Sequence, residues 1–416
     1  MKKGAARRGR GARLAALAAV ALLTTTTTRT DAQTGLTGGP QLARVYDAII
    51  DARFDQVAGL LPQTCAPLGV DLSAVALSAK AEARSAKAAA PPEACQLLEV
   101  VALWWQIQLD PGNPAHDERF RTRADAVIAT IEAWTAREPK RAEAWFYLGG
   151  AYGARAQWRV LREERLAAAR DGKRIKNALE QALALDESLQ DAYFGIGLYH
   201  YYADVAPAAL KMLRWLLLLP GGDRVQGLNE MLRARSDGQL LQSEADYQLH
   251  LIYLWYEKQP RKALELLGDL RDRHPRNPLF PQLIANVQDV YLHDLQASLR
   301  TWQTLLDAAQ ARRVAEPAMT EMSARLGLAT LLDRLSESES ALPHLRAILD
   351  SKPSSPFGIV ARAQLQLGQT LDHLGRREEA LAAYRAALAS IPARDPDGIT
   401  RAARAGLRAP HVRAKT

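Results

Sequence analysis

Apolar residues recur at three- and four-residue spacing from Leu42 to about Pro392, which is the spacing of one face of an α-helix. Turn-forming runs of Gly, Pro, Asp and Asn, such as residues 110–114, interrupt this pattern and separate the predicted helices. No stretch of useful length alternates apolar and polar residues as a half-buried strand would. The pattern therefore predicts an all-α protein made of successive helical hairpins.

Within these hairpins, small and large residues fall at fixed places. In a unit that begins at Ala142, the large residues Trp145, Leu148 and Tyr152 surround the small residue Gly149. Small residues at such places let the two helices of a hairpin approach closely, and the large ones fill the space between neighbouring hairpins. A second unit, residues 361–392, carries matching residues at fixed offsets: Leu367, Gly368, Leu371, Gly375, Ala380, Tyr384, Ala387 and Pro392.

These units resemble the tetratricopeptide repeat (TPR). The resemblance covers most of residues 142–392, with further copies beginning at Glu244, Asn277 and Glu321. It implies a right-handed α-solenoid of about eight TPR-like hairpins, because one hairpin alone cannot bury its apolar faces. We expect divergent N-terminal hairpins with an Ala-rich loop in residues 42–141, and a basic C-terminal tail in residues 393–416 that caps the solenoid or frays.

One repeat, residues 190–234, contains an insertion between its two helices. Residues 207–219 are predicted to form an inserted apolar helix, which contains six Leu and two basic residues. This helix is too short to span a bilayer, so a buried or interfacial position is expected. Asp223 is expected to cap the next helix, with Gln226 three residues on. The aromatic-rich first helix, the apolar insert and the run Gly-Asp-Arg-x-x-Gly-Leu at residues 222–228 together resemble a divergent TPR group. That group includes exported bacterial proteins and a eukaryotic mitochondrial outer-membrane group, and we transfer no activity from it.

Residues 1–32 have the three zones of a secretory signal peptide: a basic stretch, an apolar run at residues 14–23 and small residues before the cleavage point. Residues 33–41 are interpreted as a flexible linker. We therefore expect an exported protein, located in the bacterial periplasm or secreted. A membrane anchor and a twin-arginine signal at residues 7–8 are the alternatives, although the apolar run is about half the ~20 residues that a spanning helix needs.

The net charge of +8 is concentrated at the two ends of the chain. Residues 1–32 contain seven basic residues and one acidic residue, and residues 395–416 contain five basic and two acidic ones, so the body between is close to neutral. Nucleic-acid binding needs a concentrated basic surface, which the body does not supply. We therefore expect no nucleic-acid partner.

The sequence contains no motif for a phosphate loop, a zinc protease, a serine-hydrolase nucleophile or an EF-hand. Asp289 and His293 lie four residues apart and are a candidate metal pair, but a local ion pair or hydrogen bond is the favoured explanation of that spacing. The prediction is therefore a non-enzymatic protein with no cofactor and no metal site. The enzymatic alternative would use a pocket around four residues of the inserted repeat: Tyr199, His200, Asp204 and Asp223.

Cys65 and Cys95 are the two cysteines, so an exported chain permits one intramolecular pairing. The residues between them are rich in Ala, Ser, Pro and Lys. A disulfide there would restrict the unfolded chain and add about 3 kcal/mol of stability. Two buried free thiols are the alternative. Neither arrangement suggests thiol-redox or haem chemistry, because CxxC and CxxCH motifs are absent.

Binding is the function that the TPR resemblance implies, because family positions on the first helix of each repeat line a concave surface. In the units at Ala142, Gln190 and Glu244 these positions hold six aromatic residues: Phe146, Phe194, Tyr201, Tyr202, Trp255 and Tyr256. Aromatic side chains bury large areas at low entropic cost, which favours a protein or peptide partner in a concave aromatic groove. The alternative is that the inserted helix folds over these aromatics and makes them part of the core.

A second function hypothesis uses the inserted helix itself. Its Leu216–Leu219 end would attach the protein to a membrane, as a peripheral or envelope-assembly factor. The sequence makes no prediction about the identity of the partner or the oligomeric state.

Overall fold

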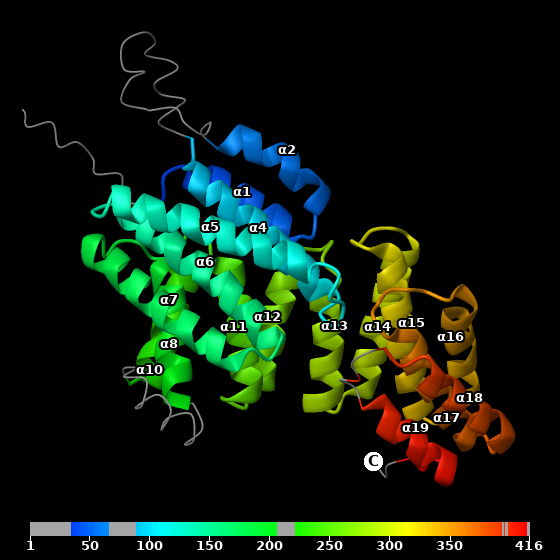
Figure 1. Ribbon diagram of the computed structural model, residues 1–416. Coiled ribbons are helices and arrows are strands. Elements are labelled where there is room, and N and C mark those ends of the chain that lie inside the picture. The colour runs from blue at the N-terminus through cyan, green and yellow to red at the C-terminus, as the bar shows by residue number, and fades with distance from the viewer. Residues whose placement is uncertain (1–34, 66–88, 206–220, 393–394, 396–397, 414–416) are drawn as a thin grey trace, which may run out of the picture. The chain divides into compact units, whose positions relative to one another are not determined.

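The computed structural model describes residues 35–65, 89–205, 221–392, 395 and 398–413 (Figure 1). In this part of the chain all regular secondary structure is helical, apart from one isolated bridge between Cys65 and Ala90. The prediction of an all-α protein is confirmed. The predicted signal peptide, residues 1–32, and the predicted inserted helix, residues 207–219, lie outside the described residues.

The described helices pair with their sequence neighbours. In chain order they are α1 (Gly39–Ile50), α2 (Phe54–Thr64), α4 (Pro92–Leu109), α5 (Asp117–Arg137), α6 (Ala142–Leu161), α7 (Arg165–Leu185), α8 (Ala192–Val205), α10 (Arg224–Asp237), α11 (Gln242–Trp255), α12 (Pro260–Arg273), α13 (Leu279–Asn286), the π-helix η1 (Val287–Tyr291), α14 (Leu295–Gln310), α15 (Pro317–Arg334), α16 (Ser338–Ser351), α17 (Ile359–His373), α18 (Arg377–Ala389) and α19 (Ile399–Arg408). Among these residues, eight hairpins form: α1–α2, α4–α5, α6–α7, α8–α10, α11–α12, α13–α14, α15–α16 and α17–α18. The helix α19 packs on α18 as a terminal cap. The repeat architecture of about eight hairpins is therefore confirmed.

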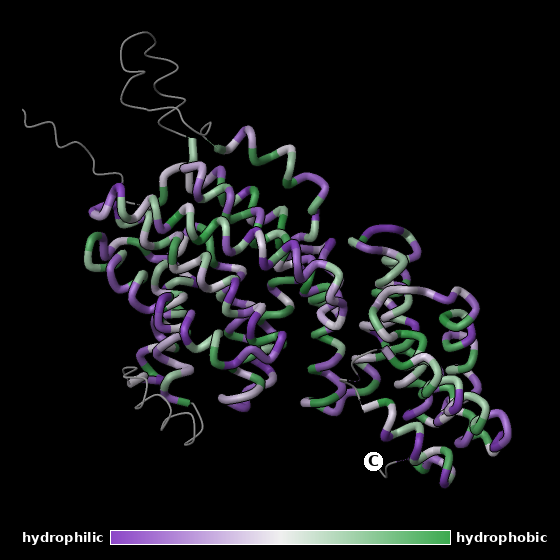
Figure 2. Tube along the Cα trace, in the orientation of Figure 1, coloured by the Kyte–Doolittle hydropathy of each residue, from purple (hydrophilic) through white to green (hydrophobic). Residues whose placement is uncertain are grey.

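Small residues hold the two helices of a hairpin at close range, as the repeat pattern predicts. A Cβ atom added to Gly149 in α6 would lie 2.6 Å from Leu179 Cδ2 in α7, and one added to Gly368 in α17 would lie 2.6 Å from Tyr384 Cε1 in α18. Apolar and polar segments alternate along the helices, because each helix buries one face and exposes the other (Figure 2). The sequence pattern thus follows directly from the packing within and between hairpins.

The N-terminal helices make contacts far along the chain. Tyr46 in α1 is hydrogen-bonded to Glu244 in α11, and the Trp105 ring in α4 lies 5.2 Å from the ring of Tyr247 in α11. The same indole is 6.1 Å from the ring of Phe280 in α13. The helices α1 and α4 therefore pack across the first helices of later repeats as well as against their own neighbours.

The segment predicted as a flexible linker, residues 33–41, is corrected by the structure over its described part. Leu36 is buried, and the Thr37 hydroxyl donates a hydrogen bond of 2.9 Å to Glu143 Oε2 in α6. Gly38 has φ +68, and a Cβ there would lie 2.8 Å from the Ala90 backbone. Glycine is needed here for the left-handed conformation and the close approach, whereas the sequence interpretation took it as a sign of flexibility.

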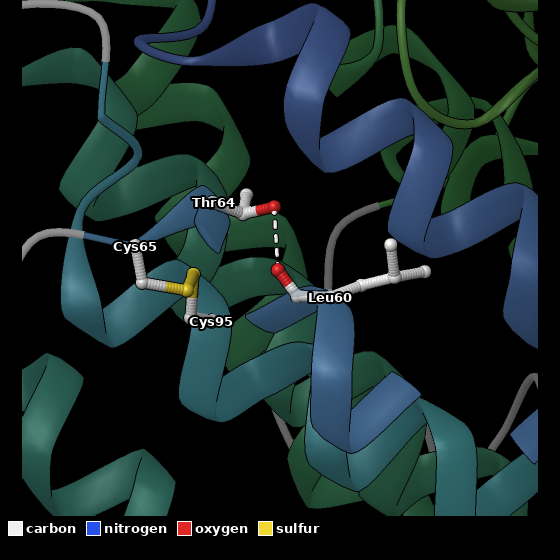
Figure 3. The surroundings of a disulfide bond; sticks show 4 residues. All are labelled: Leu60, Thr64, Cys65 and Cys95. Atoms are coloured by element: carbon white, nitrogen blue, oxygen red, sulfur yellow. Dashed lines mark hydrogen bonds between the residues drawn. A yellow bond between two sulfur atoms is a disulfide. The ribbon is translucent and has the colours of Figure 1, made fainter. Parts of the chain in front are cut away.

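Cys65 and Cys95 are joined by a disulfide in the structure (Figure 3). Their Cα atoms lie 6.2 Å apart, and the bond ties the residue after α2 to the first turn of α4. Nearby, the Thr64 hydroxyl donates a hydrogen bond of 3.0 Å to the Leu60 carbonyl at the end of α2. The two N-terminal hairpins are thus covalently linked to each other.

Candidate partner-binding site

The six aromatic residues predicted to line a groove divide into two groups. Phe146, Phe194 and Tyr201 are buried, with exposed fractions of 4%, 7% and 0%. Trp255 and Tyr256 are 51% and 40% exposed, and Tyr202 is half-buried. The prediction that Phe146, Phe194 and Tyr201 contact a partner is corrected by their burial, because a side chain with almost no exposed surface cannot reach one.

The start of the presumed groove is filled by the chain itself. Glu143, at a concave position of α6, is 8% exposed and accepts hydrogen bonds from the backbone and side chain of Thr37. A Cβ on Gly150, at another concave position of α6, would lie 3.3 Å from Leu97 in α4. The N-terminal segment, defined as residues 35–65 and 89–109, therefore covers part of α6 and, through Tyr46 and Trp105, the first turns of α11. Sequence reasoning missed this because it continued residues 42–141 as further stacked hairpins.

The last turns of these helices carry an aromatic cluster. The rings of Tyr201 and Tyr202 in α8 lie 5.7 Å apart, and the Tyr256 ring lies 5.9 Å from the first and 5.6 Å from the second. All three contacts are edge-on, the arrangement that aromatic pairs favour. Buried Tyr201 thus forms a base that supports the more exposed rings of Tyr202 and Tyr256.

Two residues that the sequence did not single out extend this cluster. The Trp255 indole nitrogen donates a hydrogen bond of 3.1 Å to the Tyr291 hydroxyl, and both Tyr291 and Val290 are exposed, by 36% and 52%. These two residues end the π-helix η1, and an extra residue per turn changes the direction in which side chains point. We define the aromatic surface as five residues: Tyr202, Trp255, Tyr256, Val290 and Tyr291.

The charged groups beside the aromatic surface are already paired. Arg224 donates to both oxygens of Glu257, at 2.8 and 2.5 Å, and the Tyr201 hydroxyl donates to the same carboxylate at 2.5 Å. The guanidinium lowers the pKa of Glu257, and burial together with the carboxylate raises the pKa of Tyr201. On η1, Asp289 is paired with Arg334 at 2.5 Å. These two ion pairs are therefore compensated, and the Lys258 ammonium, which also lies at the surface, donates a hydrogen bond of 2.6 Å to the Trp255 carbonyl.

The residues of the enzymatic alternative have structural roles in the inserted repeat. His200 Nδ1 lies 2.7 Å from Glu230 Oε2, which ties α8 to α10. Asp223 caps α10 by accepting a hydrogen bond of 2.9 Å from the Gln226 backbone, so the predicted cap is confirmed. Asp204 accepts a hydrogen bond of 3.2 Å from the Arg224 backbone nitrogen. These contacts hold the α8–α10 hairpin together.

Close backbone approach explains the glycines of the same repeat. A Cβ on Gly227 in α10 would lie 2.5 Å from the Gly197 carbonyl and 2.6 Å from the Tyr201 nitrogen in α8. Gly222 would similarly meet the Asp204 nitrogen at 2.6 Å. Gly222 and Gly227 are therefore required by the close approach of the chain to α8.

The candidate metal pair is not brought together as a site. Asp289 is engaged by Arg334, and His293 is exposed. Over the described ranges, no group of three or more His, Cys, Asp or Glu side chains is placed to hold a metal ion. No helix in the same ranges is long and apolar enough to cross a membrane.

No family model matches the sequence, and a search of curated proteins finds no match. Among solved structures, the chain is similar to the apo form of RapI, with 13% identity over 88% of this chain and 80% of that chain and a TM-score of 0.33. It is also similar to the APC/C hetero-tetramer Cut9–Hcn1, with 12% identity over 87% of this chain and 68% of that chain and a TM-score of 0.39. The assignment to an all-α repeat fold rests on the hairpins described above.

Proposed function

We propose that this protein is an exported TPR-like scaffold that binds a protein or peptide partner through the aromatic surface. The observation that carries the proposal is the 51% exposure of Trp255, which is held in place by its hydrogen bond to Tyr291. Tryptophan and tyrosine dominate the binding energy of protein interfaces because they bury large areas with few rotatable bonds. A fixed, exposed indole together with three exposed or half-buried tyrosines, Tyr202, Tyr256 and Tyr291, is suited to that role.

The chemistry of the surface indicates the kind of partner. Arg224 and Glu257 neutralise each other, as do Arg334 and Asp289, so these four residues contribute little charge to the attraction of a partner. The partner is therefore a segment with apolar or aromatic side chains, and its binding depends weakly on salt. This site differs from the groove expected from the sequence, because the partner sits at the last turns of the repeat helices, outside the part that residues 35–65 and 89–109 cover.

Export is part of the same proposal. The basic, apolar and small-residue zones of residues 1–32 support a secretory signal peptide. The Cys65–Cys95 disulfide supports an oxidising compartment such as the periplasm, where such bonds persist. The proposal assigns no catalytic step, cofactor or metal to the protein.

The test combines crosslinking with a matched pair of variants. A photo-crosslinking amino acid at position 255 or 291, introduced in cells, is expected to capture one partner that mass spectrometry then identifies. With that partner purified, Trp255→Ala combined with Tyr291→Ala should weaken binding at least ~30-fold, the size of a typical interface hot spot.

The control is Val160→Ala with Leu166→Ala, which removes exposed apolar area of α6 and α7, where the two side chains are 65% and 48% exposed. It should bind the partner as the unaltered protein does. Equal loss in both double variants, or no loss in either, would refute the aromatic surface. Flotation with vesicles that depends on position 255 would instead support the membrane-associated alternative.

A further inference from the structure

The terminal helix α19 has a strongly asymmetric surface. Its three charged residues, Arg401, Arg404 and Arg408, are all exposed, and the helix contains no acidic residue. Their spacing of three and four places them on one side of the helix. The opposite side, with Ile399 and Ala403, is buried against the preceding hairpin. We call the three residues the arginine stripe.

The arginine stripe is unpaired within the described chain. None of its guanidinium groups forms an ion pair with a described carboxylate, whereas arginines on other helices do so with residues three positions away. Arg121 lies 2.7 Å from Glu118 in α5, and Arg376 lies 2.7 Å from Glu379 in α18. The stripe thus lacks the compensation that the aromatic surface and many other arginines of this protein have.

A surface hollow of about 610 Å³ runs along the stripe. Its lining comprises the three arginines together with Asp395, Gly398, Thr400 and Ala405. The Asp395 carboxylate oxygens accept hydrogen bonds of 2.8 Å from the Ile399 and Thr400 nitrogens at the start of α19, so they are engaged by the backbone. The hollow therefore contains three guanidinium groups, each with five N–H donors, and one carboxylate, so its net charge is positive.

Tertiary contacts hold α19 in a fixed position. A Cβ on Gly406 would lie 2.5 Å from Tyr384 Cε2, and Arg377 donates a hydrogen bond of 2.7 Å to the Gly406 carbonyl. Beyond the helix, the His411 nitrogen donates to Asp372 at 2.7 Å, and Arg413 donates to the Asp333 carbonyl at 2.9 Å. The stripe is therefore presented on a rigid element, which lowers the entropy lost on binding.

We propose that the arginine stripe is a second interaction surface, which binds an acidic peptide segment of a partner protein. Guanidinium groups match carboxylates with two parallel hydrogen bonds, and three of them in a row fit carboxylates spaced along one peptide. An anionic membrane fits less well. The apolar side of α19, with Ile399 and Ala403, is buried against the preceding hairpin and cannot insert into a bilayer.

The test uses a fluorescent Glu-rich peptide and the same peptide with every Glu replaced by Gln. Fluorescence anisotropy with the full-length mature protein should show binding of the Glu-rich peptide, weaker binding at high salt, and none of the Gln-containing peptide. Replacing Arg401, Arg404 and Arg408 together by Ala should weaken binding about tenfold or more.

The matched control replaces Arg165, Arg170 and Lys173 by Ala, three exposed basic residues of α7, and so removes the same charge. This control, and Trp255→Ala in the aromatic surface, should bind the Glu-rich peptide as the unaltered protein does. Circular dichroism and the melting temperature verify that each variant is folded. Equal loss in the two triple variants would show general charge attraction and overturn the proposal. Stripe-dependent binding to vesicles containing anionic lipid, without peptide binding, would also overturn it.

Discussion

The Tyr46 hydroxyl donates a hydrogen bond of 3.2 Å to Glu244 Oε2, and this bond joins α1 to α11 across 198 residues. Glu244 is 4% exposed, and its neighbours Ala245, Tyr247 and Gln248 in α11 are buried as well. The N-terminal segment is therefore an integral part of the repeat domain. The packing of α1 against α11 buries the Glu244 carboxylate, which destabilises its charged form. A substitution that removes this charge therefore tests the interface.

Glu244→Gln should stabilise the protein at neutral pH. Burial raises the pKa of Glu244 above its ordinary value of 4.5, so the folded state disfavours the charged form. Stability contributed by the protonated form is present below about pH 4.5 and is lost as the pH rises through the folded-state pKa. The neutral amide avoids this loss, and urea unfolding at neutral pH should show a gain of about 1 kcal/mol.

Glu265→Gln, at an exposed position of α12, is the control for the change in net charge. It should leave stability within about 0.5 kcal/mol of the unaltered protein. The advantage of Glu244→Gln should shrink when the same measurement is repeated near pH 4.5. A constant advantage at both pH values would contradict the explanation by a buried charge.

His250→Phe should make the protein more resistant to acid. Burial in α11 lowers the pKa of His250 from 6.5 to about 4, and its ring packs 5.0 Å from the ring of Tyr247. Because this pKa is lowered on folding, the unfolded chain binds the extra proton first, and stability falls as the pH drops from about 6.5 to 4. Phenylalanine keeps the ring contact and cannot be protonated, so about 2–4 kcal/mol of this acid-induced loss should disappear.

The measurement is urea unfolding at a series of pH values between neutrality and pH 4. His293→Asn, which removes an exposed imidazole, serves as the comparison and should retain the full loss. If His250→Phe lost stability with acid as steeply as the unaltered protein, His250 would not be the group responsible.

Gly227→Ala should loosen the α8–α10 hairpin, because its Cβ would meet the Gly197 carbonyl at 2.5 Å. Backbone atoms cannot move aside as a flexible side chain would, so a destabilisation of about 1–3 kcal/mol is expected. Gly268→Ala is the matched control in α12, where a Cβ would meet nothing within 4 Å. There the higher helix propensity of alanine should raise stability by up to about 1 kcal/mol. A lower melting temperature for Gly227→Ala together with an unchanged or higher one for Gly268→Ala would verify the prediction. Equal shifts in the two variants would contradict it.

Removing the disulfide should destabilise the N-terminal segment. The bond between Cys65 and Cys95 closes a loop with a sequence separation of 30, for which chain entropy predicts about 3 kcal/mol. Cys65→Ser with Cys95→Ser, or addition of a reductant, should lower the free energy of unfolding by a similar amount, and the melting temperature should fall accordingly. A reductant should have no effect on the double variant, and a further decrease there would show that the reductant acts elsewhere.

The sequence by itself determined the local features of this protein. The three- and four-residue spacing predicted the helices, and the small residues Gly149 and Gly368 marked where paired helices touch. Asp223 and Gln226 predicted a helix cap that the structure contains. These features depend on residues within one hairpin, so their physical causes lie close together in the chain.

Only the tertiary structure decided which aromatic residues are accessible. The periodic pattern shows that Phe146 is on an apolar face. It does not show that residues 35–65 and 89–109 pack over the repeat helices, because that packing depends on contacts such as Tyr46 to Glu244. Similarly, the π-helix η1 directs Tyr291 toward Trp255, and the spacing of apolar residues in the sequence did not predict the extra residue in that turn. The short-range spacing of apolar residues predicts that a helix face is buried. Long-range packing determines which segment of the chain covers that face.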